Sequence, residues 1–455
     1  MDRETISDSL NTQLSLNQNS KVLVVGLGKT GFSVAKFLHQ QAIPFAVIDS
    51  RDKPPLNDAL LEEYPDTPVF TGGFDKAAFE VATHLVVSPG VSLQEESIQK
   101  SVLSGVRLVS DIDLFACSTR APVVAITGSN GKSTVTTMLG AMGNASGVKT
   151  AIGGNLGIPA LDLLDETVEL YVIELSSFQL ERTSVLNATV ATVLNVSADH
   201  MDRHDGIEGY AREKQKVFSG NGMMVVNEDD PAVKAMVEMG REILRFSVHE
   251  SVGFHLEKYL GEMWLMNDNQ ALMPQADLPL EGMHNVANAL AALAIGTAVN
   301  LKMEAMCNAL CQFKGLSHRM QRVAKLNGVT WINDSKATNV GACIAALEGY
   351  QRKVILIAGG DAKGADMKEL IPVVSEKTRF VVLVGKDADK IDTAINGCVP
   401  SYRVSSMKEA VQIAAKLAED GDSVLLSPAC ASIDQYKNYQ ERGDKFTAAV
   451  LDLAA

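Results

Sequence analysis

The sequence predicts an α/β protein in which parallel sheets are covered by helices. From Lys21 onward, short runs of β-branched residues alternate with stretches of helical periodicity, which is typical of strand–helix–strand units. The chain has 455 residues, which is too long for one ordinary core, and about 150 residues per domain gives roughly three domains. We therefore expect three α/β domains along the chain.

The strand-like runs fall into three groups that divide the chain. The first contains KVLVV, PFAVID, HLVVSP and VRLVS, the second PVVAIT, LYVIEL, TVATVLN and MMVVN, and the third VTWIND, KVILIAGG, FVVLVG and SVLLSP. We place the domains at 1–113, 114–315 and 316–455. Residues 1–20 are rich in Ser, Asn, Gln and Thr, and we expect them to be flexible and to lie outside the first core.

Charge and cysteine usage exclude several classes of protein. The formal net charge is −14, whereas nucleic acids and anionic membranes are bound through an excess of Lys and Arg. The six cysteines contain no CxxC pair, which fits reduced thiols rather than disulfides or zinc. No apolar stretch approaches the length of a membrane span, and no basic and apolar leader precedes the first strand. We expect a cytoplasmic protein without nucleic-acid or membrane partners.

The first glycine-rich loop follows the first predicted strand. VLVVGLGKTG places Gly26, Gly28 and Gly31 between a strand and a helix, and Asp49 ends the next strand. This GxGxxG arrangement allows a pyrophosphate to approach the backbone, while the acidic residue accepts ribose hydroxyl groups. Alone it would suggest NAD, or a tight turn without a ligand. A nucleotide with a pyrophosphate is favoured, and its identity stays open.

The second glycine-rich loop is the sharper signal. The strand PVVAI runs into a loop and helix start that contain Gly128, Asn130, Gly131, Lys132, Ser133 and Thr134. Backbone amides there can surround phosphates, the Lys132 ammonium can neutralise them, and the Ser133 hydroxyl can reach magnesium. The spacing GxxGKST is shorter than the general GxxxxGKST. We expect ATP in a central P-loop ATPase-type domain, between an N-terminal and a C-terminal Rossmann-like domain.

Acidic and basic side chains that follow later strands could complete this site. Glu174 ends a strand, and His200 lies in NVSADHMDRH after another, so both could reach the phosphate loop and hold magnesium, although magnesium prefers oxygen to nitrogen. A structural histidine is the alternative for His200. Lys214 and Lys216 lie in a helical stretch, and their default interpretation is two solvated surface lysines.

Further polar residues lie toward the third group of strands and within it. Asn285 lies on an apolar helix and could grip an adenine or ribose, or form a buried hydrogen bond. Arg319 could lie across a phosphate or form a surface ion pair. Polar residues also follow several strands of this group, and they suit a small substrate with carboxylates or, individually, helix caps and turns: Asp334, Ser335, Lys336, Thr338, Asn339, Lys363, Ser427, Ser432 and Lys437.

These motifs resemble, in number and order, those of the Mur ligase family and most closely its D-glutamate-adding members. The resemblance runs from Lys21 onward through GLGKTG, SPGV, TGSNGKST, GGNLG, ELSSFQLE, DHMDRH, GMHNVAN, LSHR, NDSKATN, AGGDAKGAD and LSPACASIDQYKNYQERG. The Mur-type loop TGxNGKST also accounts for the short spacing of the phosphate loop. Lys29, Ser50 and Tyr439 are positions where members of the family can differ.

The resemblance implies a role for each matching residue. For the UDP-linked substrate it implies Gly28, Lys29, Thr30, Asp49, Ser50, Arg51, Gly90 and Asn155. For ATP it implies the loop residues Gly128, Asn130, Gly131, Lys132, Ser133 and Thr134 together with Asn285, Arg319 and Asp334. Catalysis is implied for Lys132, Glu174, His200 and Lys214. Two Mg²⁺ ions are implied at Ser133, Glu174, His200 and Lys214, the last as a carbamylated lysine. For D-glutamate it implies Lys336, Thr338, Lys363, Ser432 and Tyr439.

The expected reaction is therefore an ATP-dependent amide ligation. The resemblance implies that UDP-N-acetylmuramoyl-L-alanine and D-glutamate are joined through an acyl phosphate in peptidoglycan synthesis, by an enzyme that we expect to be a monomer. The third domain is expected to swing onto the second when nucleotide binds. The alternatives are a related ligase for another amino acid or folate, and a non-ligase such as an NAD-dependent dehydrogenase or a nucleotide sensor.

Overall fold

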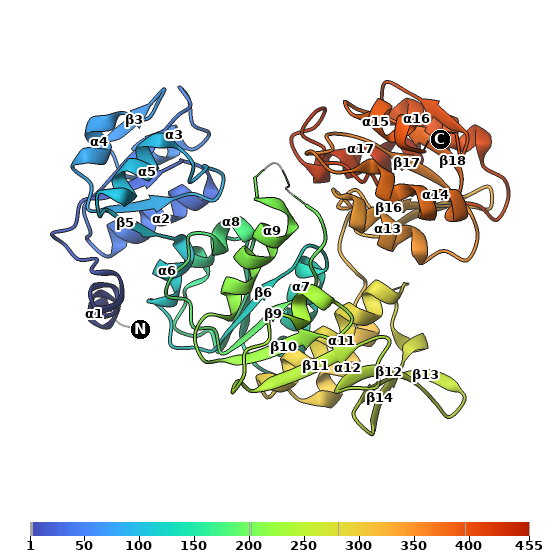
Figure 1. Cartoon of the computed structure of the whole chain (residues 1–455), viewed down its shortest axis with the longest axis horizontal. Coiled ribbons are helices and arrows are strands. Elements are labelled where there is room, and N and C mark those ends of the chain that lie inside the picture. Colours follow the sequence, from blue (N-terminus) through green and yellow to red (C-terminus); the bar gives the residue numbers. More distant parts are fainter. Residues whose placement is uncertain (1–2, 200, 202, 281, 396, 455) are drawn as a thin grey trace.

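Three sheets organise the chain into three lobes (Figure 1). The computed structural model describes residues 3–199, 201, 203–280, 282–395 and 397–454. Along the chain, the first lobe contains five strands, the second nine and the third six. The predicted α/β class with three domains is confirmed. The exact boundaries at 113 and 315 stay predictions.

The first sheet is entirely parallel, in the order β3-β2-β1-β4-β5. This order matches five of the six strands of the Rossmann order 3-2-1-4-5-6, in which ligands bind where the strand order reverses, here between β1 and β4. Helix α2 (Lys29–Gln40) follows β1 directly, so its amino end lies at that point. The strands are β1 (Val22–Val25), β2 (Phe45–Asp49), β3 (Val69–Thr71), β4 (His84–Val87) and β5 (Arg107–Val109).

The expectation that residues 1–20 lie outside the first core is wrong for the part that the structure describes. Helix α1 (Arg3–Leu14) places Leu10 and Leu14 one turn apart on one face, and both are fully buried in the first core together with Leu16. The His84 ring contacts the Leu14 carbonyl oxygen at 3.0 Å. Spacing of apolar residues by four is a helical signal, but polar neighbours obscured it in the sequence.

Leu14→Ala is expected to destabilise the first domain by about 2–5 kcal/mol, because it leaves a cavity in a closed core. Faster hydrogen exchange of the amides of β1 and β4 would measure the loss. Leu103→Ala is the matched control, because Leu103 is 87% exposed and its truncation should change stability by only about 0.5 kcal/mol. First-domain amides that exchange equally slowly in both variants would contradict the packing role of α1.

The second sheet combines a parallel body with an antiparallel extension, in the order β14-β13-β12-β11-β10-β9-β6-β8-β7. Strands β6 to β12 run parallel to one another, whereas β13 is antiparallel to both β12 and β14. They are β6 (Val123–Thr127), β7 (Thr150–Gly154), β8 (Leu170–Glu174), β9 (Val190–Val193), β10 (Met223–Asn227), β11 (Ile243–Ser247), β12 (Phe254–Tyr259), β13 (Glu262–Asn267) and β14 (Gln270–Pro274).

One face of this sheet is covered by three helices. They are α7 (Lys132–Ala145), α11 (Met283–Ala298) and α12 (Met303–Gln312), which pack against one another and share an apolar core with the sheet. Helix α7 begins directly after the phosphate loop and α11 contacts it, so the two helices fix the loop from two sides.

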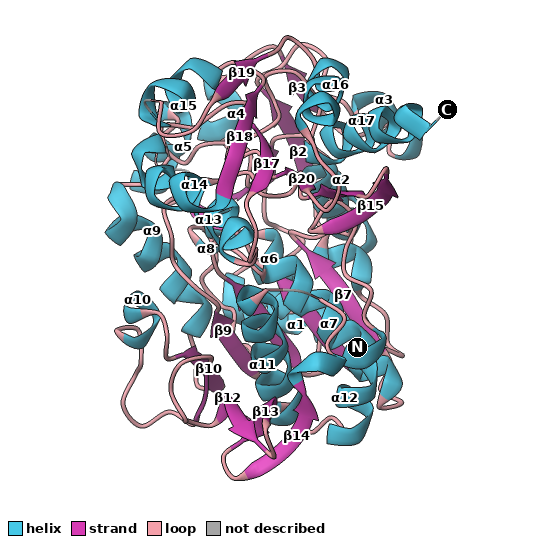
Figure 2. Cartoon of the chain, turned by 90° about the vertical axis from the view of Figure 1, so that its right-hand side faces the viewer, coloured by secondary structure: helices cyan, strands magenta, loops and turns pink. Residues whose placement is uncertain are grey.

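The third sheet has helices on both faces, as Figure 2 shows for β17 and β18. One core lies against α13 (Val340–Glu348), α14 (Ile371–Lys377) and α15 (Ala388–Ile395), and the other against α16 (Met407–Leu417) and α17 (Tyr439–Leu451). The order β15-β16-β20-β17-β18-β19 is parallel except for β15. The strands are β15 (Gln321–Leu326), β16 (Val329–Asn333), β17 (Val354–Ala358), β18 (Thr378–Leu383), β19 (Ser401–Arg403) and β20 (Ser423–Leu426).

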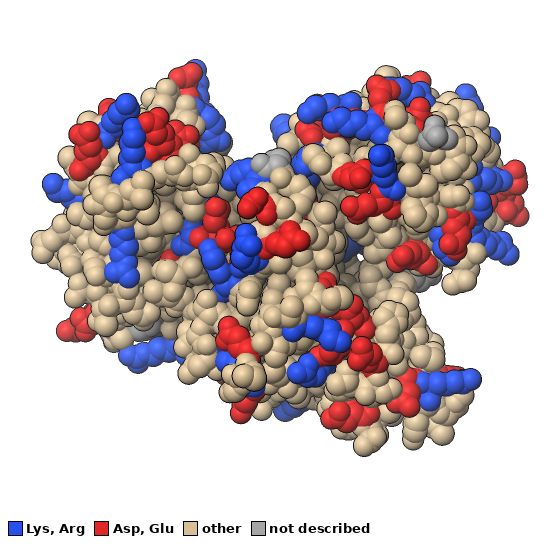
Figure 3. All heavy atoms as spheres, viewed as in Figure 1, with Lys and Arg blue, Asp and Glu red and all other residues tan. Residues whose placement is uncertain are grey.

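The surface carries charges of both signs. On the face shown in Figure 3, acidic and basic side chains are interspersed over all three lobes. Within the described residues, no helix has both the length and the apolar character that a membrane crossing requires.

Candidate active site

The loop between β6 and α7 depends on glycine at two positions. Gly128 has a φ of +150° and Gly131 a φ of +83°, which side chains rarely adopt. A Cβ atom at Gly131 would lie 2.4 Å from the Asn288 Oδ1 of α11. The Asn130 N–H donates to Asn195 Oδ1 at 2.8 Å. The loop is therefore held rigidly at the amino end of α7, where backbone amides favour an anion.

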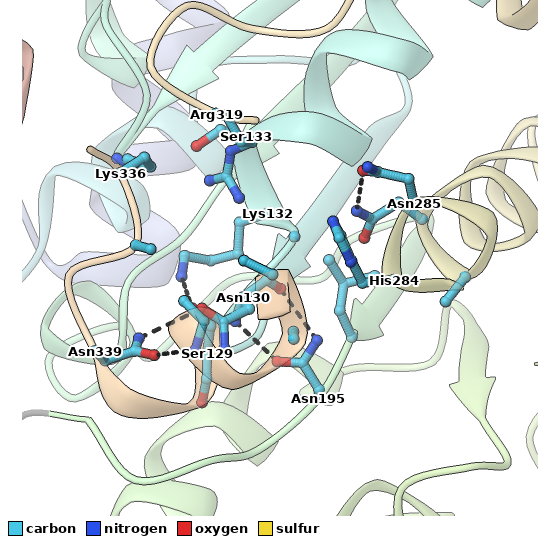
Figure 4. A pocket seen from close by; sticks show the side chains of 18 of the residues that line it. Ser129, Asn130, Lys132, Ser133, Asn195, His284, Asn285, Arg319, Lys336 and Asn339 are labelled. Atoms are coloured by element: carbon cyan, nitrogen blue, oxygen red, sulfur yellow. Dashed lines mark hydrogen bonds between the residues drawn. The ribbon is translucent and has the colours of Figure 1, made fainter. Parts of the chain in front are cut away.

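Two lysines point at the same carbonyl oxygen of this loop. Lys132 Nζ donates to the carbonyls of Gly128 at 2.7 Å and Ser129 at 2.9 Å (Figure 4). Lys214 Nζ donates to the Gly128 carbonyl at 2.9 Å. Burial lowers the pKa of both ammonium groups, and the charge of Lys132 lowers that of Lys214 further, to well below its ordinary value. Two cations so close together favour an anion between them.

The default interpretation of Lys214 as a surface lysine is wrong. Lys214 is 1% exposed, and its ammonium lies 4.2 Å from the centre of the Tyr210 ring. The neighbouring Lys216 keeps 40% of its side chain exposed and pairs with Glu213. The carboxyl end of α9 (Gly206–Gln215) thus turns one lysine into the site and the other toward solvent.

Glu174 offers an oxygen that suits a cation. Its Oε1 accepts a hydrogen bond from Asn155 Nδ2 at 2.7 Å, while Oε2 is buried and has no hydrogen-bond partner among the described residues. A buried carboxylate oxygen without a donor is costly unless a cation or water meets it. Ser133 is 3% exposed at the start of α7. Glu174 and Ser133 therefore fit the hard oxygen ligands of Mg²⁺.

The remaining predicted metal ligand is His200, which lies outside the described residues. Among the residues that the structure describes, no three His, Cys, Asp or Glu side chains form a cluster that could hold a metal ion. Mg²⁺ is commonly bound through one or two carboxylates together with substrate phosphates and waters. The protein groups seen here fit that mode of binding rather than a cage made by the protein alone.

A cavity of about 330 Å³ lies between the phosphate loop and the third domain. Asn285, Arg319 and Asp334, which were predicted at ATP, all line it, as do Lys132 and Ser133. Residues of the second and third domains that were predicted to bind ATP thus line the same cavity.

Asp334 has an unusually high pKa for an aspartate. Burial raises its pKa to about 7, against the opposing effect of Arg319 and of the Ser427 hydroxyl, which donates to it at 3.0 Å. Asp334 therefore needs a nearby cation or donor to stay ionised near neutral pH.

Of the residues predicted for D-glutamate, only some line the cavity at the phosphate loop. Lys336 and Thr338 line the same cavity as the phosphate loop. The Lys336 ammonium lies 4.0 Å from the centre of the Tyr439 ring, and burial lowers its pKa to about 8. Lys363 pairs with Asp199 at 2.6 Å. Ser432 is buried and is not among the residues that line this cavity.

The residues predicted for UDP in the first domain surround a second cavity of about 410 Å³. Its walls include Gly28, Lys29, Thr30, Asp49, Ser50, Arg51 and Gly90, whereas Asn155 lines the cavity at the phosphate loop. Burial opposes ionisation of Asp49, but hydrogen bonds from Arg51 and from the Leu27 N–H outweigh it and lower its pKa to about 2. The Asp49 carboxylate therefore orders this loop.

Arg182 is a buried contact that the sequence did not reveal. It follows α8 (Ser177–Leu180) of the second domain, and its guanidinium donates to the carbonyls of Val87, Ser88 and Val91 at 3.2, 2.6 and 3.3 Å. The Ser88 hydroxyl in turn donates to Gly26 at 2.7 Å. The wall of this first-domain cavity is thus tied to the second domain. A lone arginine after ELSSFQLE carries no recognisable signal.

Comparison with known proteins adds independent findings. Residues 20–110 match the model described as Mur ligase MurD-like, N-terminal domain, residues 126–296 the Mur ligase middle domain, and residues 318–430 the Mur ligase, glutamate ligase domain. The chain is 53% identical to a UDP-N-acetylmuramoylalanine–D-glutamate ligase of Methylococcus capsulatus, over 97% of each chain. It is 48% identical to one of Nitrosococcus oceani, over 98% of this chain and 99% of that one.

Solved structures share the fold at lower identity. The UDP-N-acetylmuramate–alanine ligase MurC of Thermotoga maritima superposes with a TM-score of 0.61 at 15% identity, over 96% of this chain and 100% of that one. MurF of Acinetobacter baumannii also gives 0.61 at 15% identity, over 98% of each chain. At these identities the likeness concerns the fold alone.

Proposed function

The chain belongs to the Mur ligase family, and from that premise we propose that it is the ATP-dependent ligase that adds D-glutamate to UDP-N-acetylmuramoyl-L-alanine in peptidoglycan synthesis. The printed activity of relatives at 53% and 48% identity over nearly the whole chain supports this substrate pair. The structural observation that carries the proposal is the shared cavity, in which Lys132 and Ser133 of the second domain face Lys336 and Thr338 of the third.

The proposed chemistry has two steps. The alanyl carboxylate attacks the γ-phosphorus of ATP, so that an acyl phosphate forms and ADP leaves; the amine of D-glutamate then attacks the acyl carbon, loses a proton and displaces phosphate. Phosphorylation is needed because a carboxylate is a poor electrophile. The Lys132 ammonium holds the transferred phosphoryl group and neutralises its charge, as phosphoryl transfer requires.

We further propose that two Mg²⁺ ions serve this site. Glu174 through Oε2, Ser133, His200 and a carbamylated Lys214 would hold them, and Mg²⁺ supplies charge neutralisation on the phosphates. Asn285, Arg319 and Asp334 would bind the nucleotide, and Lys336, Thr338, Lys363, Ser432 and Tyr439 would bind D-glutamate. The UDP cavity and Asn155 would orient the other substrate. We propose that the enzyme acts as a monomer.

ADP formation tests the proposal. Purified protein is given ATP, Mg²⁺ and UDP-N-acetylmuramoyl-L-alanine, with D-glutamate or with one of a panel of other amino acids. We expect sustained ADP release with D-glutamate only. Equal turnover with another amino acid would indicate a related ligase, whereas no turnover together with binding of NADH, seen by nicotinamide fluorescence, would favour a dehydrogenase.

A further inference from the structure

Both carboxylate oxygens of Asp199 are taken by side chains of the third domain. Lys363 Nζ lies 2.6 Å from Oδ1, and Asn339 Nδ2 donates to Oδ2 at 3.1 Å. Asp199 follows β9 of the second domain and is 9% exposed. The ion pair is largely removed from water, since only 15% of the Lys363 side chain and 10% of the Asp199 side chain are exposed. None of the steps proposed above uses Asp199.

Asn339 joins this contact to the phosphate loop. Its Oδ1 accepts the Ala342 N–H at 2.8 Å and so caps the amino end of α13, which is a common role for asparagine. Its Nδ2 also lies 3.4 Å from Asn130 Oδ1, a contact drawn in Figure 4. One side chain therefore fixes the start of a third-domain helix against both Asp199 and the loop that holds Lys132.

The two domains approach closely at this point. A Cβ atom at Gly341, in the first turn of α13, would lie 3.0 Å from Ser197 Oγ and 3.3 Å from Ser197 Cβ. These distances are tighter than ordinary packing, so the glycine permits the approach. Ser197 precedes Asp199 by two residues, and the packing and the ion pair therefore belong to one interface.

The backbone of Lys363 has an uncommon conformation that its surroundings hold in place. Its φ is +50°, which is uncommon for a residue with a side chain. The Lys363 N–H donates to Asp361 Oδ1 at 3.0 Å, which holds this turn. Such conformations persist where the surroundings determine them, and they concentrate at functional sites.

We propose that Asp199 is a positioning residue for the amino-acid substrate: it holds the Lys363 ammonium and docks α13 on the phosphate loop before D-glutamate binds. An ammonium has three N–H donors. Asp199 takes one, and two remain for a carboxylate of the incoming substrate. The inference rests on the proposed function, because that function gives Lys363 its role at D-glutamate.

Asp199→Asn tests the electrostatic half of this proposal. Asparagine keeps the size of the side chain and removes the charge that holds Lys363. We expect the KM for D-glutamate to rise at least tenfold, with kcat and the KM values for ATP and the UDP substrate within about threefold of wild type. An unchanged KM for D-glutamate would overturn the proposal. An equal rise in the KM for ATP would also overturn it, because Asp199 would then act through the nucleotide site.

A matched pair at Asn339 tests the same contact from the third domain. Asn339→Asp and Asn339→Ser both keep a side-chain oxygen that caps α13. Only the aspartate places a second carboxylate beside Asp199, where like charges at about 3 Å repel strongly. We expect Asn339→Asp to raise the KM for D-glutamate several-fold more than Asn339→Ser. Combining it with Asp199→Asn should remove the additional rise. Equal effects of the pair would show that capping alone matters and would overturn the proposal.

Small-angle scattering without substrates separates this inference from the proposed function. The ligand-free Asn339→Asp protein should have a larger radius of gyration than the Asn339→Ser protein, because repulsion opens the interface. If wild-type protein forms no ADP with D-glutamate, the proposed function fails and the scattering comparison decides the role of the Asp199 contact. Identical radii for the pair would overturn that role.

Discussion

Lys132→Ala is expected to lower ligase turnover at least about a thousandfold, which corresponds to about 4 kcal/mol of lost transition-state stabilisation. The Lys132 side chain is half-buried, and its ammonium is held by the loop carbonyls of Gly128 and Ser129 at 2.7 and 2.9 Å. A bound triphosphate would offer it a far stronger partner. Removing it would leave the charge of the transferred phosphoryl group without this cation. ADP release at saturating UDP substrate and D-glutamate measures the effect.

Two further variants separate charge from shape and from folding. Lys132→Met keeps the aliphatic stem and should be as inactive as the alanine variant. Lys149→Ala removes a lysine whose side chain is 55% exposed and should retain wild-type turnover. Binding of the UDP substrate should persist in both Lys132 variants, because the cavity proposed for UDP lies in the first domain. Turnover of Lys132→Ala within tenfold of wild type would contradict the role of this ammonium.

The parallel sheets were predictable because their signals are local. Each buried strand reads as a short apolar run, and a glycine-rich loop after a strand indicates a tight turn into a helix. Loops that follow parallel strands meet at one edge of the sheet. For this reason the first-domain residues predicted for UDP, which follow β1, β2 and β4, surround one cavity. Whether they bind UDP stays a prediction.

Strands β12, β13 and β14, which are joined by two hairpin turns, were missed, although the sequence contains turn signals for them. Leu260 and Gly261 both have positive φ between β12 and β13, and Asp268 has positive φ between β13 and β14. Such residues favour tight hairpin turns. The strands themselves mix polar and apolar residues because one end of the sheet is exposed, and this weakened the pattern.

Features that depend on tertiary contacts could not be predicted. The burial of Lys214, the hydrogen bonds of Arg182 to the first domain and the pairing of Asp199 with Lys363 all join segments distant in sequence. A lysine in a polar helical stretch is usually solvated, and only packing on the phosphate loop reverses that expectation. Helix α1 belongs to the same class, because its leucines are buried by the first core.

Substitution of Lys214 is expected to have the second large effect on turnover, because the position of this side chain is electrostatically unfavourable for an ammonium. It is 1% exposed, and its Nζ shares the Gly128 carbonyl with Lys132. Burial first, and then the charge of Lys132, lower its pKa well below the ordinary value. The neutral amine therefore forms at a lower pH than in a solvated lysine. A neutral amine can add carbon dioxide and release a proton, giving a carbamate anion beside Lys132.

Lys214→Ala and Lys214→Arg are both expected to lower turnover at least about a hundredfold, because neither side chain can become the anionic metal ligand that we propose at this position. Lys216→Ala is the matched control two residues away and should keep wild-type activity, since that lysine is partly solvated. A short carboxylate such as acetate or formate should restore part of the activity of Lys214→Ala by entering the space left by the side chain. It should not restore Lys214→Arg, which fills that space with a cation.

The pH dependence follows with a definite sign. Lowering the pH protonates the Lys214 amine and supplies the proton that carbamate formation releases, so turnover should fall toward acid pH. Added bicarbonate should restore it most strongly at the acid end. Carbon-13 NMR of wild-type protein with labelled bicarbonate should show a carbamate signal that Lys214→Arg lacks. The contrary result would be wild-type turnover that does not change when carbon dioxide is removed, at acid or at neutral pH, together with an active Lys214→Arg enzyme. It would show that the buried amine acts without modification.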